Sequence, residues 1–210
     1  MRKPSIIFEG KVYSTLSALL AALAYQYNQL VSIIFVSFAG FLLFFFRDPQ
    51  RNIPSDSNLV LSPADGRVTK IDDVESEFIG GRGKLVSIFL SPFDVHVNRS
   101  PIEGRIDFME YSRGRNYPAF LTKASDRNES NLIGIDGGQT KVMVKQIAGQ
   151  FARRIVTWVF QGDSVGMGGK LGMIRFGSRT ELFVPETVDV QVSVGDKVRA
   201  GESIIGIIGR

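Results

Sequence analysis

A long stretch without charge near the N-terminus is the feature that most constrains how this chain folds. Between Lys11 and Arg47 the sequence has no Asp, Glu, Lys or Arg. Two apolar segments occupy it, residues 13–25 and 30–46, and the polar-leaning residues 26–29 separate them. A helix needs roughly 20 apolar residues to cross a hydrocarbon core of about 30 Å, so each segment alone is short for a full span. The sequence therefore predicts apolar helix here, in contact with a membrane.

Residues 1–46 are accordingly expected to form an N-terminal membrane anchor. Three arrangements fit: one long tilted helix, a hairpin of two short helices, or a segment lying in the interface. Basic residues flank both ends of the uncharged stretch: Arg2, Lys3, Lys11, Arg47 and Arg51. Because basic residues favour the cytoplasmic side, they favour a hairpin at the cell membrane with the following domain on the cytoplasmic side. A signal peptide cleaved near residues 22–24 is a weaker alternative, since a second apolar segment follows it. The other alternative is a helix buried inside a soluble domain.

Charge and composition exclude several classes of function. The net charge of +4 and the pI near 9.4 suit an anionic membrane surface about as well as nucleic acid. There is no basic run, and Lys and Arg are interleaved with Asp and Glu, so we expect no nucleic-acid partner. The chain has no cysteine, which excludes disulfides and thiolate chemistry. Its single histidine, His96, excludes a multi-histidine metal site within one chain, and we expect no metal.

Residues 47–210 are predicted to form a compact, mainly β domain. Short runs rich in β-branched and aromatic residues recur, and Gly, Asp, Asn or Pro separates most of them. These runs are residues 85–90, 141–147, 155–160, 180–184, 188–192 and 203–208. Residues 62–68 and 194–202 each place a turn between strands, and the second resembles the hammerhead turn of biotinyl and lipoyl carrier domains. The lysine between two methionines that biotinyl carriers modify is absent, so this likeness supports a fold and not a carrier activity.

The dipeptide Gly177-Ser178 has a specific chemical potential, although Gly-Ser is also a common turn dipeptide. A serine hydroxyl can attack the carbonyl carbon of the preceding residue, and glycine there offers the least steric hindrance. The resulting ester can eliminate to dehydroalanine, and hydrolysis then leaves an N-terminal pyruvoyl group.

Five short blocks, spread over nearly the whole chain after the uncharged stretch, resemble the phosphatidylserine decarboxylase family in content and order. They are Phe46-Arg47-Asp48-Pro49, Ser62-Pro63-Ala64-Asp65-Gly66, Ser91-Pro92-Phe93-Asp94-Val95-His96-Val97-Asn98-Arg99, Asn128-Glu129 and Phe176-Gly177-Ser178. The chain is most similar to the short branch of this family, which includes archaetidylserine decarboxylase-like proteins. Each block is weak alone, whereas the ordered set is strong.

The resemblance implies that Ser178 becomes a covalent pyruvoyl cofactor. Cleavage after Gly177 would give a β chain of residues 1–177 and an α chain of residues 178–210. The pyruvoyl carbonyl would form a Schiff base with the amine of phosphatidylserine, and loss of carbon dioxide would lead to phosphatidylethanolamine. The alternative is a non-catalytic, membrane-anchored β-domain binding module, whose chain would stay intact.

The resemblance also assigns roles to two further residues. His96 would carry the catalytic proton, because the ordinary pKa of histidine lies near neutrality; otherwise it is a strand histidine with a structural hydrogen bond. Asp65 would belong to the self-processing machinery by orienting or charging a base, or else it only caps a turn. Longer family members carry a second histidine three positions after the first, where this chain has Arg99. The self-processing base assigned to that histidine is therefore missing here.

Three arginines, Arg99, Arg175 and Arg179, are candidates for contact with a lipid phosphate, a geometry that arginine suits. Solvated strand arginines are the equal alternative. The lipid backbone, acyl ester or archaeal ether, stays open, as does the formation of a homo-oligomer.

Overall fold

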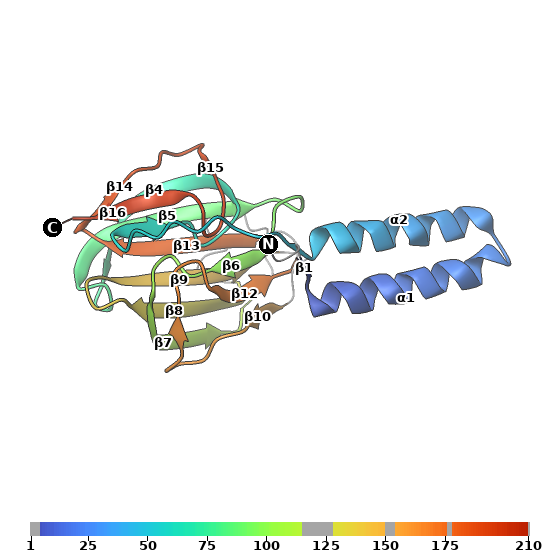
Figure 1. Cartoon of the computed structure of the whole chain (residues 1–210), viewed down its shortest axis with the longest axis horizontal. Helices are drawn as coiled ribbons and strands as arrows, with labels where there is room; N and C mark the ends of the chain where they lie inside the picture. Colours follow the sequence, from blue (N-terminus) through green and yellow to red (C-terminus); the bar gives the residue numbers. More distant parts are fainter. Residues whose placement is uncertain (1–4, 115–127, 150–153, 176–177, 210) are drawn as a thin grey trace. The chain divides into compact units, whose positions relative to one another are not determined.

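The structure is a computed structural model that describes residues 5–114, 128–149, 154–175 and 178–209 (Figure 1). The chain divides into two compact units, Met1–Gln50 and Arg51–Arg210. The first unit is a helical hairpin and the second is built from strands. Gly177 lies outside the described residues.

Two antiparallel helices make up the first unit: α1 (Phe8–Tyr25) and α2 (Gln29–Phe45). The polar break at residues 26–29 ends α1, and Asn28 starts α2. Its side-chain oxygen accepts hydrogen bonds from the backbone N–H groups of Leu30 (2.9 Å) and Val31 (3.3 Å), which would otherwise have no intrahelical partner. Two short strands, β1 (Ser5–Ile6) and β2 (Arg47–Asp48), pair where the hairpin begins and ends.

Small residues let the two helices approach closely. The Ser17 hydroxyl donates to the Phe35 carbonyl oxygen at 2.8 Å, and the Ser32 hydroxyl donates to the Ala21 carbonyl oxygen at 2.9 Å. Ser17, Ser32 and Ala21 are all buried, so the facing surfaces consist of short side chains with satisfied hydroxyls. The large apolar side chains of both helices, such as Leu19 and Ile33, lie mostly exposed on the outer sides of the hairpin.

The expectation that residues 1–46 form a membrane anchor is wrong for the part of the chain that the structure describes. No helix there is long and apolar enough to cross a membrane. The 18 residues of α1 and the 17 of α2 correspond to about 27 Å and about 25 Å at 1.5 Å per residue, against a hydrocarbon core of about 30 Å. The polar break divides one long apolar stretch into two short helices. The location at the cytoplasmic side of the cell membrane stays a prediction.

The second unit confirms the expected β-rich domain. Its largest sheet has eight strands in the order β11-β7-β8-β9-β13-β5-β4-β15, and two three-stranded sheets have the orders β10-β12-β6 and β14-β16-β3. The large-sheet strands are β4 (Gly66–Ser76), β5 (Gly81–Leu90), β7 (Gly104–Ser112), β8 (Ser130–Asp136), β9 (Lys141–Ala148), β11 (Ser164–Val165), β13 (Ser178–Pro185) and β15 (Lys197–Val198). The small-sheet strands are β3 (Leu59–Leu61), β6 (Val97–Arg99), β10 (Ile155–Thr157), β12 (Lys170–Ile174), β14 (Val188–Val190) and β16 (Ile204–Ile208).

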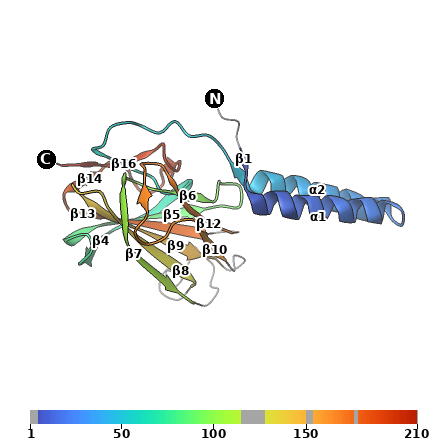
Figure 2. The same cartoon turned by 60° about the horizontal axis from the view of Figure 1, so that its bottom comes forward.

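Strand β13 lies in the interior of the large sheet, between β5 and β9 (Figure 1, Figure 2). Its first residue, Ser178, is opposite Leu90 on one side and Ala148 on the other. Leu182 and Val184 are fully buried in the main core, and side chains two positions apart on a strand share a face. Ser178 therefore projects to the core side of the sheet. The small sheet β10-β12-β6 lies beside β9 on this unit (Figure 1).

The two segments with a predicted turn are neighbours in the structure. Lys197 and Val198 of β15 pair with Arg67 and Gly66 of β4. The pairing joins the C-terminal turn to the start of the large hairpin formed by β4 and β5, so the two turn segments lie next to each other.

Gly66 allows a close approach that a side chain would prevent, and this generates a stability prediction. Its φ is +149°, and a Cβ atom there would clash with the Phe89 carbonyl oxygen. We expect Gly66→Ala to lower the free energy of unfolding by at least about 2 kcal/mol. Urea unfolding followed by Trp158 fluorescence measures it, in a Ser178→Ala background that excludes the cleavage expected from the sequence resemblance.

Gly80→Ala is the matched control, because Gly80 also has positive φ (+88°) but has nothing within 4 Å of the added Cβ. It isolates the backbone cost of roughly 1–2 kcal/mol. Equal effects of the two substitutions would show that the contact with Phe89 contributes nothing.

Candidate active site

Ser178 is the first residue of an interior strand and its hydroxyl is buried. The residue is 0% exposed, and the structure shows no hydrogen-bond partner for its Oγ among the described residues. Buried hydroxyls normally have a partner. Among the described residues Thr140 Oγ1 is a second such exception, so the candidate role of Ser178 rests on its sequence block together with this burial. Backbone pairing with Leu90 and Ala148 on both sides restricts the strand here. The carbonyl that Ser178 would attack belongs to Gly177, outside the described residues.

His96 is positioned by a tight turn that follows β5. The carboxylate of Asp94 accepts hydrogen bonds from the backbone N–H (2.8 Å) and hydroxyl (2.6 Å) of Ser91, which closes the turn. The Nδ1 atom of His96 then lies 3.0 Å from the Asp94 carbonyl oxygen. A carbonyl only accepts, so Nδ1 carries the proton and Nε2 carries the lone pair in the neutral ring. The imidazole is 1% exposed.

The topology brings His96 and Ser178 to the same end of the sheets. The turn that carries His96 begins directly after Leu90, the residue opposite Ser178. On its other side, the backbone N–H of Ile174 donates to the His96 carbonyl oxygen at 3.2 Å, four positions before Ser178. His96 is thus connected to the end of β12, and the residue opposite Ser178 directly precedes the turn that carries His96.

The sequence block Asn128-Glu129 contacts the residue of β9 that is opposite Ser178. The Asn128 side chain donates to the Ala148 carbonyl oxygen at 2.7 Å, and the Ala148 N–H donates to the Glu129 carbonyl oxygen at 2.9 Å. Ala148 is the residue opposite Ser178 on β9. The structure therefore assembles three separate sequence blocks around the first residue of β13.

The carboxylate of Asp65 contacts two other segments of the domain. Its carboxylate accepts from Arg51 at 2.9 Å and from the backbone N–H of Ala200 at 2.8 Å. Arg51 also lies 3.5 Å from Glu202, so the carboxylate joins a charge cluster at the C-terminal turn. These contacts of Asp65 link segments of the fold, and its role in orienting a base stays a prediction.

The candidate phosphate-binding arginines are not solvated in two of the three cases. Arg99 is 7% exposed and donates to the Gly168 carbonyl oxygen at 3.0 Å. Arg179 is 6% exposed, and its Nη1 lies 3.8 Å from Glu181 Oε1, on the face of the sheet opposite Ser178. Burial lowers the pKa of Arg179, and the charge of Glu181 opposes that shift. The alternative of solvated strand arginines is therefore wrong for these two.

Glu129 is a buried acid near the site to which sequence reasoning gave no role of its own. Its carboxylate accepts from the Ile155 N–H at 3.1 Å, and the residue is 9% exposed. Burial raises the pKa of Tyr111, and a hydrogen bond to Glu129 and its negative charge raise that pKa further. Only its place in the block Asn128-Glu129 could have identified Glu129 as a site residue, because a single glutamate forms no recognisable sequence motif.

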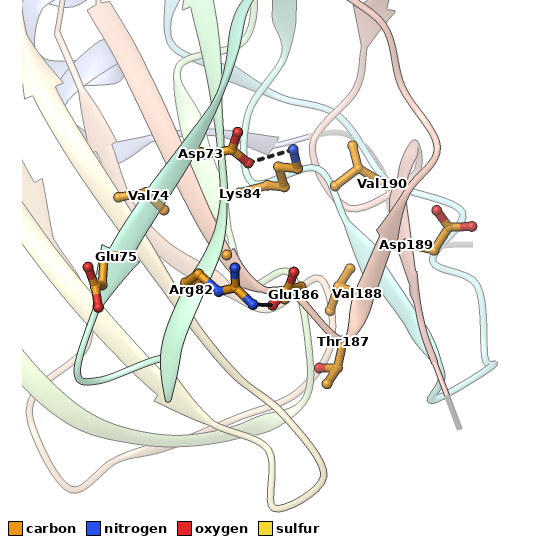
Figure 3. A pocket seen from close by; sticks show the side chains of 11 residues that line it. Asp73, Val74, Glu75, Arg82, Lys84, Glu186, Thr187, Val188, Asp189 and Val190 are labelled. Atoms are coloured by element: carbon orange, nitrogen blue, oxygen red, sulfur yellow. Dashed lines mark hydrogen bonds and ion pairs between the residues drawn. The ribbon is translucent and has the colours of Figure 1, made fainter.

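A cavity of about 820 Å³ lies at the other end of β13, and Figure 3 shows its lining. Two ion pairs join residues of its lining: Lys84 with Asp73 at 2.6 Å and Arg82 with Glu186 at 3.3 Å. It includes Gly83, which pairs with the last residue of β13, Pro185. At about 3.4 Å per residue, this end is roughly 24 Å from Ser178. The cavity therefore does not belong to the site around Ser178.

Comparison with known proteins yields one family. The sequence profile described as phosphatidylserine decarboxylase matches residues 38–206. A phosphatidylserine decarboxylase proenzyme of Symbiobacterium thermophilum is 44% identical over 98% of this chain and 97% of its own length, and one of Carboxydothermus hydrogenoformans is 43% identical over 99% of both. A protein of Archaeoglobus fulgidus, provisionally named archaetidylserine decarboxylase proenzyme, is 44% identical over 90% of this chain and 89% of its own length.

The buried pair of Arg179 and Glu181 generates a prediction for stability. Glu181→Leu is expected to cost about 3–5 kcal/mol of unfolding free energy, because the buried guanidinium loses this carboxylate. The double variant Arg179→Leu/Glu181→Leu should cost clearly less than the two single variants together. Urea unfolding of Ser178→Ala chains measures all three, and strict additivity would contradict the pairing.

Proposed function

The chain belongs to the phosphatidylserine decarboxylase family, and we propose that it is a precursor that cuts itself before Ser178 and then decarboxylates phosphatidylserine or a serine lipid with the same head group. The product would be the corresponding ethanolamine lipid. Two kinds of support meet here: the relatives are named proenzymes, and Ser178 Oγ is buried with no described hydrogen-bond partner. Family membership sets aside the alternative of a non-catalytic binding module.

In the proposed self-cleavage, Ser178 Oγ attacks the Gly177 carbonyl carbon. The C–N bond breaks and an ester to Ser178 forms, while the serine oxygen loses its proton and the nitrogen gains one. Removal of the α-proton of Ser178 then breaks the bond between its Cβ and the ester oxygen, which leaves a carboxylate on Gly177 and dehydroalanine at position 178. The enamine tautomerises, and water replaces its nitrogen, which leaves as ammonia; a pyruvoyl group remains.

The surroundings of Ser178 fit such a group. Position 178 points to the core side of the sheet, where burial excludes bulk water. Once formed, the group supplies a carbonyl that condenses with the serine amine of the lipid and accepts electrons as carbon dioxide leaves. The double backbone pairing of β13 would hold the new chain end in place after the cut.

His96 is the proposed proton carrier of the decarboxylation. The hydrogen bond of its Nδ1 to the Asp94 carbonyl directs the lone pair to Nε2, the atom that would exchange protons. The chain has no second histidine, so His96 is the proposed donor of the proton that the substrate carbon takes up after carbon dioxide has left. Arg99, at the position of the second histidine, is held by Gly168 and takes no part in that step.

The proposal predicts two chains from one precursor. Denaturing intact-mass measurement of the purified protein should show residues 1–177 and residues 178–210, the smaller with a carbonyl-bearing, blocked N-terminus. Ser178→Ala should give one uncut chain and no decarboxylation, because it removes the nucleophile and the source of the group. A single full-length species after long incubation of the folded wild type would refute self-processing.

His96→Gln should lower decarboxylation per cut chain by about 10²-fold or more, as expected for loss of a general acid–base group. Release of carbon dioxide from serine-labelled lipid gives the rate, and intact mass gives the cut fraction, so that slow processing is not mistaken for slow catalysis. Urea unfolding controls for misfolding. A variant that both cuts and decarboxylates at the wild-type rate would remove His96 from the mechanism.

A further inference from the structure

Three of the fully buried polar side chains that the structure describes in the second unit form one hydrogen-bonded network. Asn98 on β6, Gln146 on β9 and Thr180 on β13 are each 0% exposed. A buried amide without hydrogen bonds costs several kcal/mol, so such groups persist only when they are satisfied. These three satisfy one another. Asn98 belongs to a small sheet, whereas Gln146 and Thr180 face each other across two strands of the large sheet.

One backbone carbonyl sets the orientation of the whole network. Asn98 Nδ2 lies 3.3 Å from the Pro63 carbonyl oxygen, which only accepts, so the amide nitrogen must point there. The same nitrogen donates to Thr180 Oγ1 at 3.1 Å. Asn98 Oδ1 then accepts from Gln146 Nε2 at 2.8 Å, and Gln146 Oε1 accepts from Asn131 Nδ2 at 3.1 Å. Each amide has a single orientation that satisfies its neighbours.

Two members of the network are close in sequence to the two candidate reacting residues, and at the same offset from each. Asn98 is two residues after His96, and Thr180 is two residues after Ser178. Ser178 and Thr180 are two apart on β13, so they point to the same side, while His96 lies one residue before the start of β6. The hydrogen bond between Asn98 and Thr180 therefore ties β6 to β13 next to the imidazole and next to the nucleophile.

Apolar side chains of similar volume would fill this space without a desolvation cost. Apolar contacts are non-directional, however, and two packed sheets can shift by a fraction of an ångström with little change in buried area. A directional hydrogen bond resists such a shift. Reaction rates are sensitive on that scale, since a misplacement of about 1 Å can cost about 10²-fold.

We propose that Asn98, Gln146 and Thr180 are positioning residues that hold His96 and Ser178 in reacting geometry across the two sheets. The proposal rests on the proposed self-cleavage and decarboxylation and adds a role to three residues that do not touch the reacting atoms. The hydroxyl of Thr180 is the link on the nucleophile strand, and Gln146 holds the Asn98 amide in the orientation that this link needs.

Thr180→Val tests the link, because it removes the hydroxyl and keeps the shape of the side chain. The full-length chain is synthesised in a cell-free reaction, and loss of intact precursor with time gives the self-cleavage rate. We expect a decrease of about tenfold or more. Thr180→Ser keeps the hydroxyl and should stay near the wild-type rate. Thr140→Val is the matched control, a buried threonine directly before β9, at the end of that strand away from Gln146, whose Oγ1 has no described partner.

A readout on the cut enzyme separates positioning from general structure. For the fraction of Thr180→Val that does cut, kcat should fall while KM for the lipid stays unchanged. Folding is measured on Ser178→Ala counterparts by urea unfolding. If Thr180→Val proves unfolded there, Gln146→Met carries the same test, because it removes the donor to Asn98 from a different strand and should also slow cleavage.

The outcomes separate this inference from the proposed function. Slow cleavage of folded Thr180→Val, with normal cleavage of Thr180→Ser and Thr140→Val, supports the network. Cleavage of Thr180→Val at the wild-type rate, or slowing by Thr140→Val to the same extent, overturns the network and leaves the proposed function standing. An uncut wild type overturns the proposed function itself.

Discussion

The pairing of β13 with a neighbour on each side is the constraint on which the site depends. Ser178 is opposite both Leu90 and Ala148, and each of those residues leads to another part of the site. Leu90 precedes the turn to His96, and Ala148 is hydrogen-bonded to Asn128 and Glu129. A slip of one residue in either ladder would turn Ser178 to the opposite face. The direction of this hydroxyl is thus a property of two strand registers and not of the serine alone.

The two ends of β13 differ in chemistry. Near Ser178 both faces of the strand carry polar groups: Thr180 with the amide network on one side, and Arg179 with Glu181 on the other. Farther along, Leu182 and Val184 belong to the apolar core. The apolar end of β13 is stabilised by packing in the core, whereas the end at Ser178 is stabilised by hydrogen bonds and an ion pair. The charged cavity of about 820 Å³ lies beyond the apolar end, so a sizeable cavity alone is a poor guide to the site in this protein.

The β-rich domain could be predicted because runs of β-branched and aromatic residues alternate with turn residues through residues 47–210. Such a local pattern identifies strands without knowledge of which strands pair. The ordered blocks predicted Ser178 and His96 as candidates, and the structure places them at one end of the sheets. Register and non-local pairing could not be read from the chain, so the amide network around Asn98 was missed. The break at residues 26–29 and the two short helices were expected from the sequence, and the structure has that hairpin. The membrane anchor was wrong because, among the described residues, neither helix combines the length and apolar character that a span requires.

The place of β13 in the smaller chain makes folding of the precursor different from refolding of the cut protein. The segment after the proposed cut supplies β13, β14, β15 and β16, so the smaller chain holds an interior strand of the main sheet. Folding of the precursor is an event within one molecule, but once cut, an unfolded copy could refold only if two separate chains met again. Its recovery would depend on concentration, and its working lifetime on how slowly it unfolds. The mature form would be preserved by a kinetic barrier, having folded once as a single chain.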